Sequence, residues 1–179
     1  MKKLFELDAR LSARLRIAEK PGKRRRLAIL FGHSGDSWFW LAGLLLLIWL
    51  GDEAWRRLAI TMLAGILVTA VLVLAIKFTV RRQRPEGEWG QIYRRTDPHS
   101  FPSGHAVRAV MLAIVALSLG PAWFGWLLLV WAPLVGIARV ATGLHYVSDV
   151  LAGWVLGIAM GMVTLQLAGP LWSLVAQFL

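Results

Sequence analysis

The stretch LAITMLAGILVTAVLVLAI (residues 58–76) contains no charged side chain, and it decides the structural class of this protein. An α-helix of about 20 apolar residues crosses the hydrocarbon core of a bilayer, which is about 30 Å thick. The rest of the chain agrees, since 58% of its 179 residues are hydrophobic and its mean hydropathy is +0.61. Soluble domains are only about 45–50% apolar. We therefore predict an integral-membrane protein in which residues 58–76 form a membrane-spanning helix.

Further apolar stretches on both sides of this helix predict additional membrane spans. They cover residues 38–50, 103–119, 122–140 and 147–167. Pro85 is expected to end the helix that begins at Leu58, because proline cannot continue a helix. Glycines recur at every fourth residue of the last span, a spacing that lets helices pack closely within one chain: Gly153, Gly157 and Gly161. The predicted fold is all-α, an integral-membrane helical bundle of about five transmembrane helices.

The N-terminal segment differs in composition from the rest of the chain. Residues 1–26 hold ten lysines and arginines against three acids, which accounts for most of the net charge of +10. Leucines recur at helical spacing between residues 4 and 15, as in a helix that lies in the membrane interface. We divide the chain into a basic amphipathic interfacial segment (1–35) and a helical bundle (36–179). The segment is expected to contact anionic head groups rather than nucleic acid, although a solvated arm is an alternative.

Counting the membrane crossings places most of the ionisable residues of the spans on one face. Buried charges inside a membrane are costly and usually mark a functional site. The predicted crossings bring the following residues to one face: Lys77, Arg81, Arg84, Ser103, His105, Arg108, Arg139, His145 and Asp149. The turn between the first two spans, at the opposite face, carries Asp52, Glu53, Arg56 and Arg57. We therefore expect a functional site at the first of these faces.

Basic residues and a helix start on this face suggest a site for an anion. Lys77 and Arg84 are seven residues apart, so on one helix they would point in the same direction. Ser103 and Gly104 begin a predicted helix, where free backbone N–H groups and the helix dipole favour negative charge. Arg139 adds a cation from another span. Lipid anchoring by these cations is the alternative interpretation.

Histidines on the same face suggest catalysis. Asp149 follows His145 by four residues, so in a helix the carboxylate would hold one ring nitrogen and leave the other free to attack. His105 could donate a proton. A metal site is an alternative, with possible ligands His99, His105, His145 and Asp149. The neighbouring cations favour a phosphate over a metal ion. The chain contains no cysteine, which excludes thiol catalysis and cysteine-based metal sites.

Three motifs resemble the type 2 phosphatidic acid phosphatase family, membrane phosphatases that share a site with vanadium haloperoxidases. The family pattern K-x6-R-P matches KFTVRRQRP (77–85), P-S-G-H matches residues 102–105, and S-R-x5-H-x3-D matches ARVATGLHYVSD (138–149), with Ala138 in place of serine. The resemblance implies that His145 attacks phosphorus, that Asp149 holds it and that His105 protonates the leaving oxygen. It implies substrate binding by Lys77, Arg84, Ser103, Gly104 and Arg139, with no metal or other cofactor.

The expected function is that of a membrane-embedded lipid phosphate or pyrophosphate phosphatase that forms a phosphohistidine. Phosphatidic acid, phosphatidylglycerophosphate, a polyprenyl pyrophosphate and a lipid A phosphate are the candidate substrates. A lipid phosphotransferase that uses the same phosphohistidine is one alternative, and a non-enzymatic transporter or scaffold for anionic lipids is another. The expected location is a cell membrane, with several spans, and a bacterial inner membrane in particular. Both faces of that membrane remain open for the site.

Overall fold

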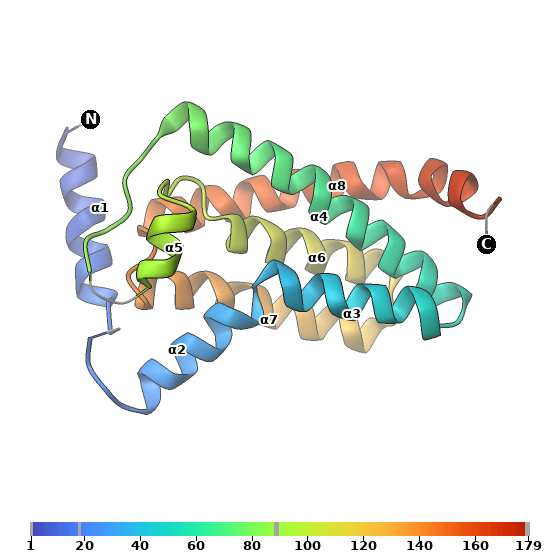
Figure 1. The fold of residues 1–179 in the computed structure, drawn as a ribbon, viewed down its shortest axis with the longest axis horizontal. Helices are drawn as coiled ribbons and strands as arrows, with labels where there is room; N and C mark the ends of the chain where they lie inside the picture. Colours follow the sequence, from blue (N-terminus) through green and yellow to red (C-terminus); the bar gives the residue numbers. More distant parts are fainter. Residues whose placement is uncertain (1, 18, 88–89, 178–179) are drawn as a thin grey trace.

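The chain folds into a bundle of helices in the computed structural model (Figure 1), which describes residues 2–17, 19–87 and 90–177. In chain order the helices are α1 (Lys2–Leu15), α2 (Lys23–Ser34), α3 (Ser37–Leu50), α4 (Glu53–Val80), α5 (Gln91–Thr96), α6 (Gly104–Leu119), α7 (Ala122–Ala141) and α8 (Val147–Val175). The described residues form no strand longer than an isolated bridge between Gln83 and His99. The predicted all-α fold is confirmed.

The charge-free stretch of residues 58–76 lies in α4, a helix of 28 residues. At its start the Asp52 side chain accepts a hydrogen bond from the backbone N–H of Trp55 at 3.0 Å, which satisfies a free donor of the first turn. The helix ends at Val80, where Arg81 takes a left-handed conformation with φ 51°. Pro85 was predicted to end this helix, and that prediction was wrong, because the chain leaves the helix before it reaches the proline.

The core of the bundle forms around α6, which packs most extensively against α7 and α8 and also against α4. Small side chains of α6 such as Ala106 and Ala109 are fully buried. A Cβ atom added at Gly157 of α8 would lie 2.7 Å from the carbonyl oxygen of Val107, and one at Gly161 would lie 2.9 Å from Cβ of Ile114. The glycines of α8 therefore allow close packing within the chain, as predicted.

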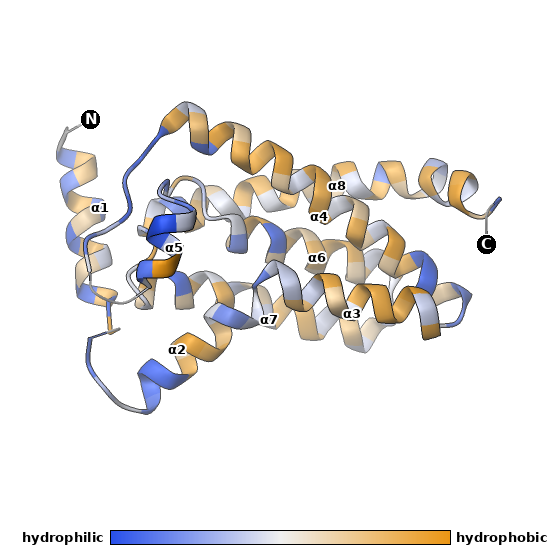
Figure 2. Ribbon diagram, in the orientation of Figure 1, coloured by the Kyte–Doolittle hydropathy of each residue, from blue (hydrophilic) through white to orange (hydrophobic). Residues whose placement is uncertain are grey.

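Within the part of the chain that the structure describes, three helices are long and apolar enough to span a membrane: α4, α7 and α8. The other two predicted spans are the apolar helices α3 and α6, with 14 and 16 residues. At about 1.5 Å per residue these two are about 21 and 24 Å long, shorter than the hydrocarbon layer. Apolar residues predominate along α4 (orange in Figure 2), and large apolar side chains are exposed on the outside of the bundle; Val71 and Val155 are each 70% exposed. The chain is a membrane protein.

The predicted interfacial segment contains two helices, α1 and α2, joined by a turn near Gly22. The basic run of residues 23–26 forms the first turn of α2, which packs on α7. Figure 1 shows α1 lying across the end of the bundle. Leucines 4, 7, 11 and 15 of α1 are exposed, whereas Ser12 on its other side is 5% exposed and faces the bundle. The interfacial location of residues 1–35 stays a prediction.

Candidate active site

Lys77 and Arg84 meet at one carboxylate, but not by the route that the sequence suggested. Arg84 lies beyond the end of α4, in an extended segment that pairs with the residues before α6. Lys77 Nζ donates to Asp97 Oδ2 at 2.7 Å, and an Nη of Arg84 donates to the same oxygen at 2.8 Å. Arg81, expected to lie between them, is exposed and donates to the carbonyl oxygen of Phe78. Asp97 was not predicted as a site residue.

The cations at this point are buried, which makes them strong partners for an anion. Lys77 is 3% exposed and Arg139 is 1% exposed. Burial lowers the pKa of Arg84 to about 10, with the nearby Asp97 carboxylate opposing the shift and the charge of Arg139 adding to it. Arg84 therefore stays charged at neutral pH. Within the described residues, Nε of Arg139 is a buried donor without a hydrogen-bond partner, and the guanidinium lies 4.6 Å from the ring centre of Tyr93.

The loop between α7 and α8 holds His145 against these cations. The chain turns at Gly143, whose φ of 69° suits glycine. The backbone N–H groups of Leu144 and His145 donate to the carbonyl oxygen of Arg139 at 3.1 and 3.3 Å. His145 is consequently 1% exposed, with Nε2 at 2.9 Å from an Nη of Arg84.

The protonation of His145 follows from its neighbours. A guanidinium only donates, so Nε2 of His145 accepts, and the proton of the neutral ring lies on Nδ1. Burial lowers the pKa of His145 well below its ordinary value, and the charges of Arg84, Arg139 and Lys77 add to the shift. The ring is therefore neutral at neutral pH, with the Nε2 lone pair turned toward the cations.

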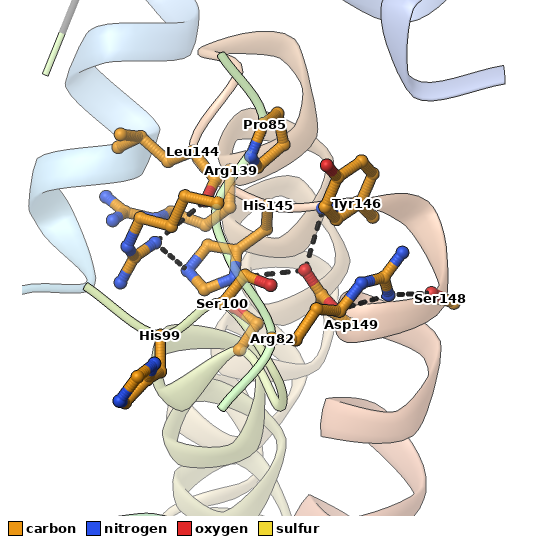
Figure 3. A network of polar contacts seen from close by, with 12 residues as sticks. Arg82, Pro85, His99, Ser100, Arg139, Leu144, His145, Tyr146, Ser148 and Asp149 are labelled. Carbon is orange, nitrogen blue, oxygen red and sulfur yellow. Dashed lines mark hydrogen bonds and ion pairs between the residues drawn. The ribbon is translucent and has the colours of Figure 1, made fainter. Parts of the chain in front are cut away.

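Asp149 lies on the Nδ1 side of this ring (Figure 3). Its Oδ2 is 3.6 Å from Nδ1 of His145, longer than a hydrogen bond, and accepts from the backbone N–H of Tyr146 at 2.8 Å. Its Oδ1 accepts from Arg82 at 2.8 Å, and the Arg82 guanidinium stacks 3.9 Å from the Tyr146 ring centre. The predicted neighbours are thus adjacent, with the carboxylate fixed by groups that the sequence did not reveal.

A chain of contacts connects Asp149 to the N-terminal helix. Arg82 also donates to Asp8 Oδ2 of α1 at 2.7 Å. The other oxygen of Asp8 accepts from the backbone N–H of Ser148 at 3.1 Å. The sequence gave no signal for this arrangement, because Asp8, Arg82 and Ser148 are far apart in the chain and come together only when it folds.

The N-terminus of α6 brings the PSGH motif to the same place. Ser103 is fully buried; its hydroxyl accepts from the backbone N–H of Ala106 at 3.4 Å, and its own N–H donates to the carbonyl oxygen of Asp149 at 3.0 Å. Gly104 and His105 line the cavity beside the cations. Nε2 of His105 is 2.7 Å from Oδ1 of Asp36, the residue before α3, which was not predicted as a site residue.

These groups surround one cavity of about 230 Å³. Its polar lining includes Lys77, Arg84, Asp97, His105, Arg108, Arg139 and His145. Apolar residues of α4, including Ala70 and Val73, continue the lining into the membrane-spanning part. No three histidine, cysteine or acidic side chains of the described residues come close enough together to hold a metal ion, so the alternative metal site is not assembled. Metal independence itself stays a prediction.

Comparison with known proteins identifies the family of this chain. The family model described as the PAP2 superfamily matches residues 54–172. The chain is 30% identical over 152 residues to the undecaprenyl-diphosphatase of Sulfolobus acidocaldarius, covering 81% of this chain and 72% of that protein. It is 34% identical over 107 residues to the decaprenylphosphoryl-5-phosphoribose phosphatase of Mycobacterium tuberculosis, covering 59% of each.

Solved structures share the fold. The crystal structure of Aquifex aeolicus LpxE superimposes with a TM-score of 0.66 at 24% identity, over 89% of this chain and 95% of that one. A PAP2 type phosphatidylglycerolphosphate phosphatase from Bacillus subtilis gives a TM-score of 0.71 at 23% identity, over 95% of this chain and 88% of that one. The prediction of a membrane phosphatase of this family is confirmed: the chain belongs to the PAP2 superfamily.

Proposed function

We propose that this protein hydrolyses a phosphate or diphosphate ester of a membrane lipid through a phosphohistidine on His145, without a metal ion. The observation that carries the proposal is the position of a neutral imidazole nitrogen among buried cations. Nε2 of His145 and the donors of Lys77, Arg84 and Arg139 border the same cavity. Such an array stabilises the charge on a transferring phosphoryl group, which is the main task in this chemistry.

In the first step, the Nε2 lone pair of His145 forms a bond to phosphorus while the bond from phosphorus to the leaving oxygen breaks. The electron pair of that bond stays on the leaving oxygen, which takes a proton from His105. Lys77, Arg84 and Arg139 hold the nonbridging oxygens, together with backbone and hydroxyl donors at Gly104 and Ser103. Asp149 stabilises the positive charge that forms on the imidazole.

In the second step, water replaces the lipid. His105 takes a proton from the water, the water oxygen bonds to phosphorus, and the N–P bond breaks with its electrons returning to Nε2. Inorganic phosphate leaves, and His105 is again protonated. Arg84 must exchange its contact with Nε2 for a contact with the substrate, since this nitrogen is its acceptor in the structure.

A lipid substrate is supported by the shape of the cavity and by the relatives. The apolar wall on α4 runs from the cations into the spanning part of the helix, where an acyl or prenyl chain can lie. Two relatives are named undecaprenyl-diphosphatase and decaprenylphosphoryl-5-phosphoribose phosphatase, and a Porphyromonas gingivalis relative is named lipid A 1-phosphatase. We place the protein in a bacterial inner membrane.

The test is phosphate release by the purified protein in detergent, with EDTA, from the four candidate lipid phosphates. We expect release from at least one, abolished by His145→Ala and retained by Thr164→Ala, which removes another buried side chain far from the site. Labelled phosphate should be trapped on the wild-type protein as an acid-labile adduct. Loss of activity in EDTA that zinc restores would contradict the metal-free mechanism. Transfer of label to a second lipid would identify a phosphotransferase.

A further inference from the structure

Asp36 stands directly before α3, where an aspartate normally caps the helix, but its side chain makes no capping hydrogen bond. The carboxylate is turned instead toward His105, which lines the cavity. Oδ1 is 2.7 Å from Nε2 of His105, and Oδ2 is 2.9 Å from Nδ1 of His33 in α2. The Tyr93 hydroxyl lies 3.0 and 3.1 Å from the two oxygens. Three elements therefore direct polar groups at one carboxylate that is 9% exposed.

Arg108 holds the backbone on both sides of Asp36. One Nη donates to the hydroxyl of Ser37 at 2.8 Å, and the other donates to the carbonyl oxygen of Gly35. A Cβ atom at Gly35 would lie 2.8 Å from Val135 and 3.1 Å from Cδ2 of His105, so this turn passes as close to the His105 ring as packing allows. The position of Asp36 is therefore fixed from both sides of the chain.

Resting on the proposed function, we infer that Asp36 is the positioning residue of the proton donor His105, so that the site contains two histidine–carboxylate pairs. Asp149 lies beside the nucleophile His145, and Asp36 accepts a hydrogen bond from the acid His105. An ionised carboxylate only accepts hydrogen bonds, so Nε2 of His105 keeps its proton. Nδ1 is then the nitrogen that exchanges a proton with the leaving oxygen and later with water.

The charges around His105 explain why it requires such a partner. Positive charges of Arg108 in α6 and Arg139 in α7 lie near the His105 ring, and Asp36 is the carboxylate in hydrogen-bond contact with it. Burial alone would raise the pKa of Asp36, but the hydrogen bonds from His105, His33 and Tyr93 hold it well below its ordinary value. Asp36 is therefore ionised at neutral pH and can support the protonated form of His105.

The experiment uses two phosphate monoesters with matched alkyl tails, one with an alkanol and one with a nitrophenol as the leaving group. A nitrophenolate leaves without a proton, so its release does not need an acid. We expect Asp36→Asn to slow hydrolysis of the alkyl ester by about 10²-fold, within the range of general acid catalysis. The pre-steady-state burst of nitrophenol should keep its wild-type rate. Asp52→Asn, at the cap of α4, is the matched control and should leave both rates unchanged.

Two further measurements separate positioning from a structural effect. In a His105→Ala background, Asp36→Asn should cause no further loss, because the two residues act as one unit. Tyr93→Phe removes one hydrogen-bond donor to Asp36. It should slow hydrolysis of the alkyl ester selectively, by a smaller factor than Asp36→Asn. This variant replaces Asp36→Asn in the test if Asp36→Asn does not fold. Equal losses for both esters, or additive losses with His105→Ala, would overturn the inference. A wild-type protein that releases neither leaving group would overturn the proposed function itself.

Discussion

The His145 imidazole lies among Lys77, Arg84 and Arg139, and this setting decides its protonation. A positive charge on the ring would be buried beside other positive charges, which is why burial and these cations hold the pKa of His145 well below its ordinary value. The His145 imidazole therefore stays neutral in the folded protein under conditions where a histidine in the unfolded chain takes up a proton.

This difference predicts a pH dependence of stability. Below about pH 6.5 the unfolded chain binds a proton at residue 145 that the folded chain does not bind, so the free energy of unfolding falls as the pH falls. The change approaches about 1.4 kcal/mol per pH unit between 6.5 and the lowered pKa. Melting temperatures of wild type and His145→Gln in detergent, from pH 7.5 to 5.5, would measure it. The advantage of the wild type should shrink toward pH 5.5, and a constant difference would contradict the prediction.

Some of the site was predictable from single residues, and some was not. Lys77, Arg84, His105, Arg139, His145 and Asp149 were found because their motif spacings and the crossing count both brought them to one face. The reason given for Lys77 and Arg84 was wrong, since they meet through Asp97 rather than along one helix. Asp36 and Asp97 belong to turns whose course depends on packing of α3 and α5, which no local periodicity encodes.

The helix α1 contributes to the site as well as to the membrane-facing surface. Its exposed leucines lie on one side, and Asp8 on the other side contacts Arg82 and Ser148. Because Arg82 also holds Asp149, the position of α1 affects the carboxylate beside His145.

Asp8→Ala should therefore reduce activity without removing any group that contacts the substrate. We expect kcat to fall about tenfold, equivalent to about 1.4 kcal/mol in the barrier, because Arg82 loses one of its anchors. Glu6→Ala, on the same helix and exposed, is the control and should retain wild-type kcat. The measurement is steady-state phosphate release by both variants in the same detergent. A loss shared by Glu6→Ala would point to membrane binding of α1 rather than to Arg82.

The contact between α6 and α8 sets the distance between the PSGH motif at the start of α6 and Asp149 at the start of α8. A Cβ atom at Gly153 of α8 would lie 2.9 Å from Cβ of Ala106 and 3.0 Å from the carbonyl oxygen of Ser103. Close to this contact the N–H of Ser103 donates to the carbonyl oxygen of Asp149. The glycine thus allows the PSGH motif and Asp149 to share one end of the bundle.

Gly153→Ala should lower both stability and activity, because the extra carbon forces α6 and α8 apart. Overpacking of this kind costs about 1–3 kcal/mol. Gly169→Ala is a control in the same helix, where an added Cβ has no neighbour within 4 Å. It should raise stability by about 0.5–1 kcal/mol, since alanine favours helix over glycine. Thermal unfolding and phosphate release of both variants would test this, and an unchanged Gly153→Ala protein would refute the packing argument.

The molecule as a whole places its N-terminal helices and its site at one end, with the α3–α4 turn at the other (Figure 1). This agrees with the crossing count made from the sequence, because α3 and α4 lie between the two ends and return the chain to the same face. What the count could not predict is α5, which brings Tyr93 to Asp36 at this end.

Introduced cysteines would test this arrangement in a membrane, since the chain has none of its own. Lys20→Cys and Gln91→Cys should react alike with a membrane-impermeant thiol reagent in intact cells. Glu53→Cys, in the opposite turn, should show the reverse accessibility. All three side chains are exposed, so a failure to react reports the side of the membrane. Opposite results for residues 20 and 91 would contradict the arrangement.

The Asp97 carboxylate between Lys77 and Arg84 has a consequence for a protein surrounded by phospholipid. Bulk phospholipids are phosphodiesters with one negative charge on the phosphate, the same charge as the carboxylate, so they gain little by displacing it. A phosphomonoester carries about −1.5 to −2 at pH 7 and gains more. We therefore expect Asp97 to act as an internal counterion that disfavours binding of bulk phospholipids relative to a phosphomonoester. Asp97→Asn should therefore be inhibited by phosphatidylglycerol in mixed micelles, at concentrations that leave the wild-type rate unchanged.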